Sequence, residues 1–177
     1  MLAKASMNIY SDTSSLFSNA SRHADAKNQQ EAAAIADLLE VHKQGKISML
    51  RSNLSRHELE RTRSVKQKDA LLRDFLLLVP VAKDEKVLGF DSIQTDPFGG
   101  FVTNPLVSDV QDEPLVERLM KELGLPKPDA QHLAQGISNK ADVFLTRDEE
   151  HFIKQRLTIE SQFKIKVRLP SELLSEI

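Results

Sequence analysis

Short apolar runs alternate along this chain with longer segments of helical periodicity. The runs at 7–11, 47–51 and 142–146 have the length and content of buried strands. Alternating apolar and basic residues in FKIKVR, at 163–168, predict a last strand. Helical spacing is found at 28–43, about 53–65, 113–123 and 129–139, with a strongly apolar piece at 70–79 and a closing helix from Pro170. Strands separated by helices predict an α/β fold of three layers, in which helices cover both faces of a central, mostly parallel sheet.

Residues suited to helix ends support several of these boundaries. Asn28 is placed to cap the first predicted helix and Gly45 to end it, and Gly124 is placed to end a later one. Asp129 follows Pro128 and is placed as the N-cap of its own helix. For Asp129 taken alone, capping is therefore the simpler interpretation.

The stretch 83–113 differs from the rest of the chain. It holds Gly89, Pro97, Gly99, Gly100, Asn104 and Pro105 without a sustained helical period. This pattern is typical of a loop with one or two short strands. Because 177 residues suffice for one sizeable core but hardly for two, we expect a single domain over 1–177 with this stretch inserted in it.

Composition narrows the chemistry. The chain has no cysteine, which excludes disulfides, thiolate metal sites and cysteine nucleophiles. No apolar run reaches the length of a membrane span, and the first residues lack the apolar core of a signal peptide, so we expect a cytoplasmic protein with no membrane partner. The formal net charge of −2 argues against a generic basic nucleic-acid binder, but an acidic site that holds divalent cations can still meet nucleic acid.

Acidic residues follow several of the predicted strands. Asp12 comes directly after the first strand and Asp148 after the strand VFLT, at the edge where open parallel sheets bind ligands. Asp142 begins that second strand and is separated from Asp148 by about 20 Å, at ~3.3 Å per extended residue. We therefore expect Asp142 at the opposite edge of the sheet as a solvated residue. Glu149 and Glu150 are expected to face solvent.

Four carboxylates from four separate segments are then expected near one edge of the sheet: Asp12, Glu58, Asp129 and Asp148. For Glu58 alone, a solvated helix face is the simpler interpretation. Together the four acids would repel one another unless cations held them, and hard oxygen ligands suit Mg²⁺ or Mn²⁺. Such a set is typical of metal-dependent phosphodiester hydrolysis.

Three stretches carry these acids: NIYSDTSSLF with Asp12, SNLSRHELER with Ser52 and Glu58, and DAQHLAQGISNKADVFLTRDEEHF with Asp129 and Asp148. In this order they resemble the four motifs of PIN domains, in particular the toxin-type, VapC-like endoribonucleases. The closing IKVRLPSELL is similar to the last strand and helix of that fold. The stretch 83–113 departs from the pattern, because such proteins often have a shorter connection there.

The resemblance implies a PIN-like fold and a metal-dependent endoribonuclease. Its site residues would hold one or two Mg²⁺ or Mn²⁺ ions: Asp12, Glu58, Asp129 and Asp148. In-line attack of water on an RNA phosphodiester would leave a 5′-phosphate and a 3′-hydroxyl. Whether such an ion is single or paired stays open at this point.

Other residues near the acids are candidates for supporting roles. Thr13, Ser14 and Thr146 would orient water or phosphate, or else are ordinary turn and cap residues. Among the basic residues, Arg56 and Arg147 lie nearest the predicted acids and are our candidates for phosphate contacts. The remaining basic residues around the helix of Glu58 are expected to be solvated.

Two histidines, His57 and His132, are further acid–base candidates. Because His132 comes one turn after Asp129 in the same predicted helix, we expect it to be packed or hydrogen-bonded rather than catalytic.

Other functions remain open. A catalytically silent PIN-like protein would bind RNA or regulate without cleaving, although all four acids are retained. An aspartyl phosphotransferase would need a second Asp at position 14, and a nucleotide-binding Rossmann protein would need a Gly-rich first turn, which DTSS lacks. A toxin of this type works with an antitoxin protein, and apolar helix faces within 28–73 could instead serve the core or a homodimer contact.

Overall fold

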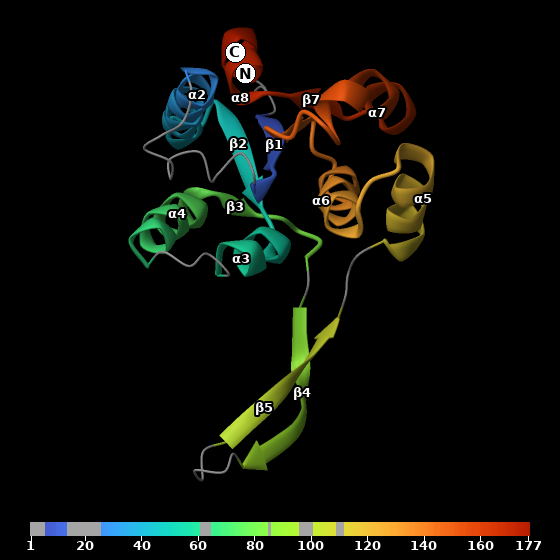
Figure 1. The fold of residues 1–177 in the computed structure, drawn as a ribbon. Helices are drawn as coiled ribbons and strands as arrows, with labels where there is room; N and C mark the ends of the chain where they lie inside the picture. The colour runs from blue at the N-terminus through green and yellow to red at the C-terminus, as the bar shows by residue number, and fades with distance from the viewer. Residues whose placement is uncertain (1–5, 14–25, 61–64, 85, 96–100, 109–111) are drawn as a thin grey trace, which may run out of the picture.

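The structure, a computed structural model, describes residues 6–13, 26–60, 65–84, 86–95, 101–108 and 112–177. Its strands are β1 (Met7–Ser11), β2 (Ile47–Arg51), β3 (Val79–Pro80), β4 (Lys86–Thr95), β5 (Phe101–Ser108), β6 (Val143–Leu145) and β7 (Lys166–Arg168). Its helices are α2 (Ala26–Lys43), α3 (Asn53–Glu60), α4 (Val65–Leu77), α5 (Glu113–Leu123), α6 (Lys127–Ser138), α7 (Arg156–Phe163) and α8 (Pro170–Glu176), with a 3₁₀ turn at Ile153–Gln155. Figure 1 shows their arrangement around the central sheet.

Five strands form one sheet in the order β3-β2-β1-β6-β7, and every neighbouring pair in it is parallel. In the register of the sheet, Tyr10 of β1 faces Leu50 of β2 and Phe144 of β6. The carboxyl ends of these three strands therefore meet at one edge. The predicted α/β fold with a central parallel sheet is confirmed.

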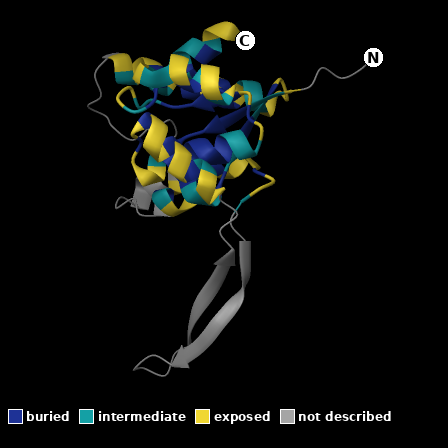
Figure 2. Cartoon of the chain, turned by 90° about the vertical axis from the view of Figure 1, so that its right-hand side faces the viewer, coloured by how far each residue is buried: buried dark blue, intermediate teal, exposed yellow. Residues whose placement is uncertain are grey.

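Alternate residues of the central strands serve two different cores, as the two-residue period of a strand requires. Ile9 packs in a core with residues of α2, α3, α4 and α8, whereas its neighbour Tyr10 packs in a second core with residues of α5, α6 and α7. Figure 2 shows buried strands between helices whose outer faces are exposed. These are the three predicted layers, α/β/α.

One helix approaches the sheet especially closely. A Cβ atom added at Gly136 of α6 would lie 3.3 Å from the Ile165 side chain and 3.5 Å from that of Tyr10. The absence of a side chain at Gly136 thus lets α6 pack tightly on β1. Since α6 also carries Asp129, this contact fixes the position of a candidate site residue.

Two predicted helix caps are wrong. Asn28 lies inside α2, which begins at Ala26. Helix α6 begins at Lys127 with Pro126 as its N-cap residue, so Asp129 stands in the first turn and does not cap the helix. Pro128 fits that first turn because no backbone N–H is needed there. The carboxylate of Asp129 is therefore available for other contacts.

The stretch 83–113 was expected to be mostly loop with one or two short strands. Instead, β4 and β5 are 10 and 8 residues long and form an antiparallel sheet of their own. In Figure 1 this hairpin extends away from the five-stranded sheet. Its register shifts between Val87 and Gly89 and between Phe90 and Ser92. Such irregularities are typical of β-bulges, and glycine often marks them.

The helix predicted over about 53–65 ends at Glu60 as α3, and most of the apolar piece 70–79 lies in α4. Other differences lie near the carboxyl end. The strand predicted from Phe163 begins only at Lys166, because Phe163 ends α7, and Lys164 caps that helix with a left-handed φ of 57°. Helix α7 and the short strand β3 were not predicted. By contrast, the bounds of β1, β2 and α5 are those expected, and Gly124 ends α5 in the left-handed conformation.

Candidate metal site

The four predicted acids come from segments that meet at the carboxyl edge of the sheet. Asp12 directly follows β1, and its backbone N–H donates to the carbonyl of Leu145, the last residue of β6. Asp148 follows the same end of β6. Glu58 lies in α3, the helix that follows β2, and Asp129 in the first turn of α6. The parallel order of β2, β1 and β6 thus determines which side chains share this edge.

Thr146 connects two of these acids. Its hydroxyl donates to Asp12 Oδ2 over 2.9 Å and accepts the backbone N–H of Asp148 over 3.0 Å. Both Thr146 and Asp12 are buried. One hydroxyl group therefore orients the carboxylate after β1 and the turn after β6 together.

His151 connects Asp148 to a third acid, Asp129. Its Nδ1 lies 2.9 Å from Asp148 Oδ2 and 3.1 Å from Asp129 Oδ2. The backbone N–H of His151 also donates to Asp148 Oδ1 over 2.9 Å. One ligand atom from each of these three residues lies within 4.8 Å of the others, which is close enough for a single metal ion.

Glu58 joins the site through a buried polar chain. Its Oε1 lies 3.2 Å from Nε2 of His132, a buried residue one turn after Asp129 in α6. His132 Nδ1 is 3.1 Å from the Tyr10 hydroxyl, which is in turn 2.6 Å from Ser52 Oγ. The expectation that His132 is packed and hydrogen-bonded is confirmed. It links Glu58 to the helix that carries Asp129.

Burial and neighbouring charged groups shift the pKa values of Asp129 and Asp148. Burial raises the pKa of Asp129; His151 opposes this shift, whereas the charges of Asp12 and Asp148 add to it. Burial alone would raise the pKa of Asp148, but hydrogen bonds from the backbone and side chain of His151 lower it below its usual value. The carboxylates that follow β1 and β6 and the one on α6 therefore interact electrostatically.

Both histidines of the site respond to the same charges. The hydrogen bond to Asp148 raises the pKa of His151. Burial opposes protonation of His132, but the contact with Glu58 and the charges of Asp12 and Asp129 raise its pKa overall. The two imidazoles are therefore biased toward the positive form and offset part of the acidic charge.

Thr13 is the only other predicted hydroxyl residue within the described part of the chain. It is buried, and among the described residues its Oγ1 has no hydrogen-bond partner. A buried hydroxyl without a partner is unusual and calls for an explanation, such as a water or ligand. The predicted role of Ser14 falls outside the described residues.

The two predicted phosphate contacts differ in their surroundings. Arg56 is exposed on α3, two residues before Glu58. Arg147 is partly buried, and its guanidinium donates to Asn28 Oδ1 on α2. Arg147 is therefore held toward α2, whereas Arg56 is accessible from solvent.

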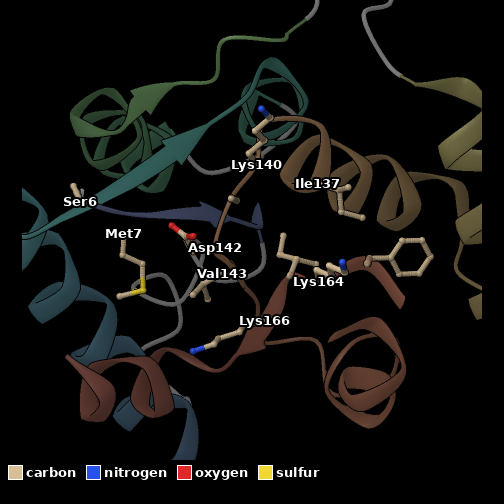
Figure 3. A pocket seen from close by; sticks show the side chains of 11 residues that line it. Ser6, Met7, Ile137, Lys140, Asp142, Val143, Lys164 and Lys166 are labelled. Atoms are coloured by element: carbon tan, nitrogen blue, oxygen red, sulfur yellow. The ribbon is translucent and has the colours of Figure 1, made fainter. Parts of the chain in front are cut away.

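Asp142 lies at the opposite, amino edge of the sheet, as expected from its position in the chain. Its carboxylate accepts the backbone N–H of Asn8 over 2.7 Å. It lines an open cavity of about 680 Å³ that also includes Met7, Val143 and Lys166 (Figure 3). Glu149 and Glu150 are exposed, as predicted, and Glu149 forms an ion pair with Lys27 of α2.

Sequence reasoning missed His151. The signal was its position three residues after Asp148, in a turn whose first carboxylate accepts the backbone N–H of the third following residue. That spacing brings the imidazole beside the carboxylate, but nothing in the local sequence shows that Asp129 lies on its other side.

Comparisons with known proteins found no relative of this chain. No protein-family model matches the chain, and no match is found among curated proteins or solved structures. Within the described part of the chain, no helix has both the length and the hydropathy that crossing a membrane requires. The family of the chain is therefore not shown, and its function is inferred from the residues of the site.

Proposed function

We propose that this protein is a metal-dependent endoribonuclease of the PIN type. The observation that supports the proposal is that Asp129, Asp148 and His151 offer ligand atoms within 4.8 Å of one another at the carboxyl edge of a parallel sheet, while Asp12 and Glu58 lie in segments that follow other strands at this edge. This is the edge at which open α/β sheets bind ligands. Carboxylates that lie close together repel one another, and a divalent metal would relieve this repulsion.

The residues present suit Mg²⁺ or Mn²⁺. Both ions take carboxylate oxygens, and Mg²⁺ commonly uses only a few of them beside water and substrate phosphate. A bound ion would lower the pKa of a water ligand and neutralise charge that develops on the phosphoryl oxygens. Burial raises the pKa of Asp129, and the neighbouring charges of Asp12 and Asp148 add to this shift.

The chain's own residues have distinct parts in this proposal. Thr146 orients the carboxylate of Asp12 and the backbone of Asp148, and His151 holds the carboxylate of Asp148, so both carboxylates would be oriented before an ion binds. Glu58 is supported by His132. Thr13, which follows Asp12 in the chain and whose buried hydroxyl has no hydrogen-bond partner among the described residues, would bind a water or a phosphate oxygen.

The substrate would be RNA, held by Arg56 and Arg147 through its phosphates, with cleavage leaving a 5′-phosphate. A toxin role, an antitoxin partner, a homodimer and a cytoplasmic location belong to the same proposal and are supported by the sequence motifs alone. The second candidate function is a catalytically silent RNA-binding protein of the same fold.

An assay of RNA cleavage distinguishes these two functions. The wild-type protein should cut end-labelled RNA with Mg²⁺ or Mn²⁺ and stop when the metal is chelated. Asp12→Asn and Asp129→Asn should each abolish cleavage while leaving the protein folded. Asp142→Asn is the matched control, because its carboxylate lies at the amino edge and the amide can still accept the N–H of Asn8. RNA binding without cleavage in the wild type would support the silent protein instead.

A further inference from the structure

His151 lies between two of the proposed metal ligands rather than behind them. The same atom, Nδ1, approaches both Asp148 Oδ2 at 2.9 Å and Asp129 Oδ2 at 3.1 Å. The side chain is 36% exposed, so solvent and ions can reach it. Its backbone N–H is fixed on Asp148 Oδ1, which keeps the ring beside the carboxylate.

These separations are those of hydrogen bonds, and they also match the spacing of neighbouring ligand atoms around one ion. In an octahedral site with metal–ligand distances of ~2.1 Å, adjacent ligand atoms lie about 3.0 Å apart. The contacts of Nδ1 with Asp148 and with Asp129 both agree with this value. The three ligand atoms lie within 4.8 Å of one another, so an ion between them needs only small side-chain movements.

An imidazole nitrogen changes which ion such a site prefers. Carboxylate and water oxygens serve Mg²⁺ and Mn²⁺ alike, and imidazole is typical of Zn²⁺, Cu²⁺, Fe²⁺ and Ni²⁺. Mn²⁺ is also a first-row transition ion and accepts a nitrogen ligand more readily than the harder Mg²⁺. Mg²⁺ is typically held by carboxylates, waters and phosphates. We infer that His151 is a nitrogen ligand of this site and makes it select Mn²⁺ over Mg²⁺, an inference that rests on the proposed metal-dependent function.

A role as a metal ligand differs in an observable way from a purely positioning role. If His151 only oriented Asp129 and Asp148 through hydrogen bonds, its nitrogen would stay outside the coordination shell. Electron spin echo measurements on bound Mn²⁺ distinguish the two roles, because a directly coordinated imidazole nitrogen produces a nitrogen coupling. This readout does not depend on cleavage.

The experiment adds Mn²⁺ alone to the metal-free, full-length protein. The wild type should show the nitrogen coupling, and His151→Gln and His151→Asn should lose it. The ratio of Mn²⁺ to Mg²⁺ affinity should fall about tenfold or more in either variant. His42→Gln is the matched control and should keep both the coupling and the ratio, because His42 lies near the carboxyl end of α2 and contacts the carbonyl of Ile47.

The outcomes separate this inference from the proposed function. Mn²⁺ binding without a nitrogen coupling in the wild type, or a coupling that persists in both His151 variants, would overturn the inference and leave the metal site standing. Failure of the wild type to bind either ion would overturn both.

Discussion

Thr146 Oγ1 donates a hydrogen bond to Asp12 Oδ2 over 2.9 Å and thereby joins the ends of β1 and β6 at the candidate site. The same oxygen accepts the N–H of Asp148 over 3.0 Å. A hydroxyl that donates and accepts at once can be replaced by another hydroxyl but not by a methyl group. Thr146 therefore positions the carboxylate of Asp12 relative to the backbone of Asp148.

Thr146→Val should weaken both metal binding and stability. The substitution removes one donor to Asp12 Oδ2 and the hydroxyl that accepts the Asp148 N–H, and the loss of such buried hydrogen bonds costs about 1–3 kcal/mol. Calorimetric titration with Mn²⁺ and urea unfolding measure the two effects. Thr146→Ser, which keeps the hydroxyl, should stay close to the wild type in metal affinity. Equal losses in the Val and Ser variants would contradict an orienting role for the hydroxyl.

Tyr10→Phe should lower the free energy of unfolding, although the substitution changes no charge. The Tyr10 hydroxyl is buried and contacts both Ser52 Oγ and His132 Nδ1. Its removal leaves these two buried groups short of a partner, at a cost of about 1–3 kcal/mol. Because His132 also contacts Glu58, metal affinity should fall as well. Unchanged unfolding in urea would show that the polar chain from Tyr10 to Glu58 carries no stability.

Arg56→Gln should weaken RNA binding but not metal binding. Arg56 is exposed on α3 beside Glu58, and a lost phosphate contact lowers the slope of log affinity against log salt by about one unit. Fluorescence anisotropy of labelled RNA over a series of salt concentrations measures that slope. Lys121→Gln, on the exposed side of α5, is the control. The same slope in wild type and Arg56→Gln would remove Arg56 from the RNA-binding surface.

The metal-free protein should lose stability as the pH rises above about 6.5. The hydrogen bond to Asp148 raises the folded-state pKa of His151 above its unfolded value of about 6.5. The resulting stabilisation is full below about pH 6.5 and disappears as the pH passes the folded pKa. Melting temperatures should therefore fall less steeply with pH in His151→Gln than in the wild type. Parallel curves would mean that His151 is not stabilised as a cation.

Local patterns predicted those parts of the fold that depend on local physics. The apolar residues of Ile47–Arg51 and the terminal Gly124 of α5 specify their elements without help from distant residues. The hairpin of β4 and β5 was missed because glycine and proline in strands look like loop residues until their pairing is known. Phe163 shows the same difficulty, since its alternation with Ile165 suggests a strand, although Phe163 ends a helix.

The sequence predicted those site residues whose position follows from the carboxyl ends of the parallel strands. Asp12 and Asp148 follow parallel strands, and that fact is enough to bring them to one edge. Asp129 was assigned to the right edge but given the wrong local role, because its helix begins earlier, at Lys127. His151 and the contact of His132 with Glu58 depend on how α6 and α3 pack, which periodicity does not specify.

We propose above all that Asp12, Glu58, Asp129 and Asp148 bind a divalent metal. The most direct test is the gain in unfolding free energy that Mn²⁺ gives to the wild type, Asp129→Asn and Asp142→Asn. Saturation at about 100 times the dissociation constant should stabilise the wild type by about 2.7 kcal/mol. Asp142→Asn should gain the same amount and Asp129→Asn far less. Equal gains in all three proteins, or no gain in the wild type, would contradict the claim.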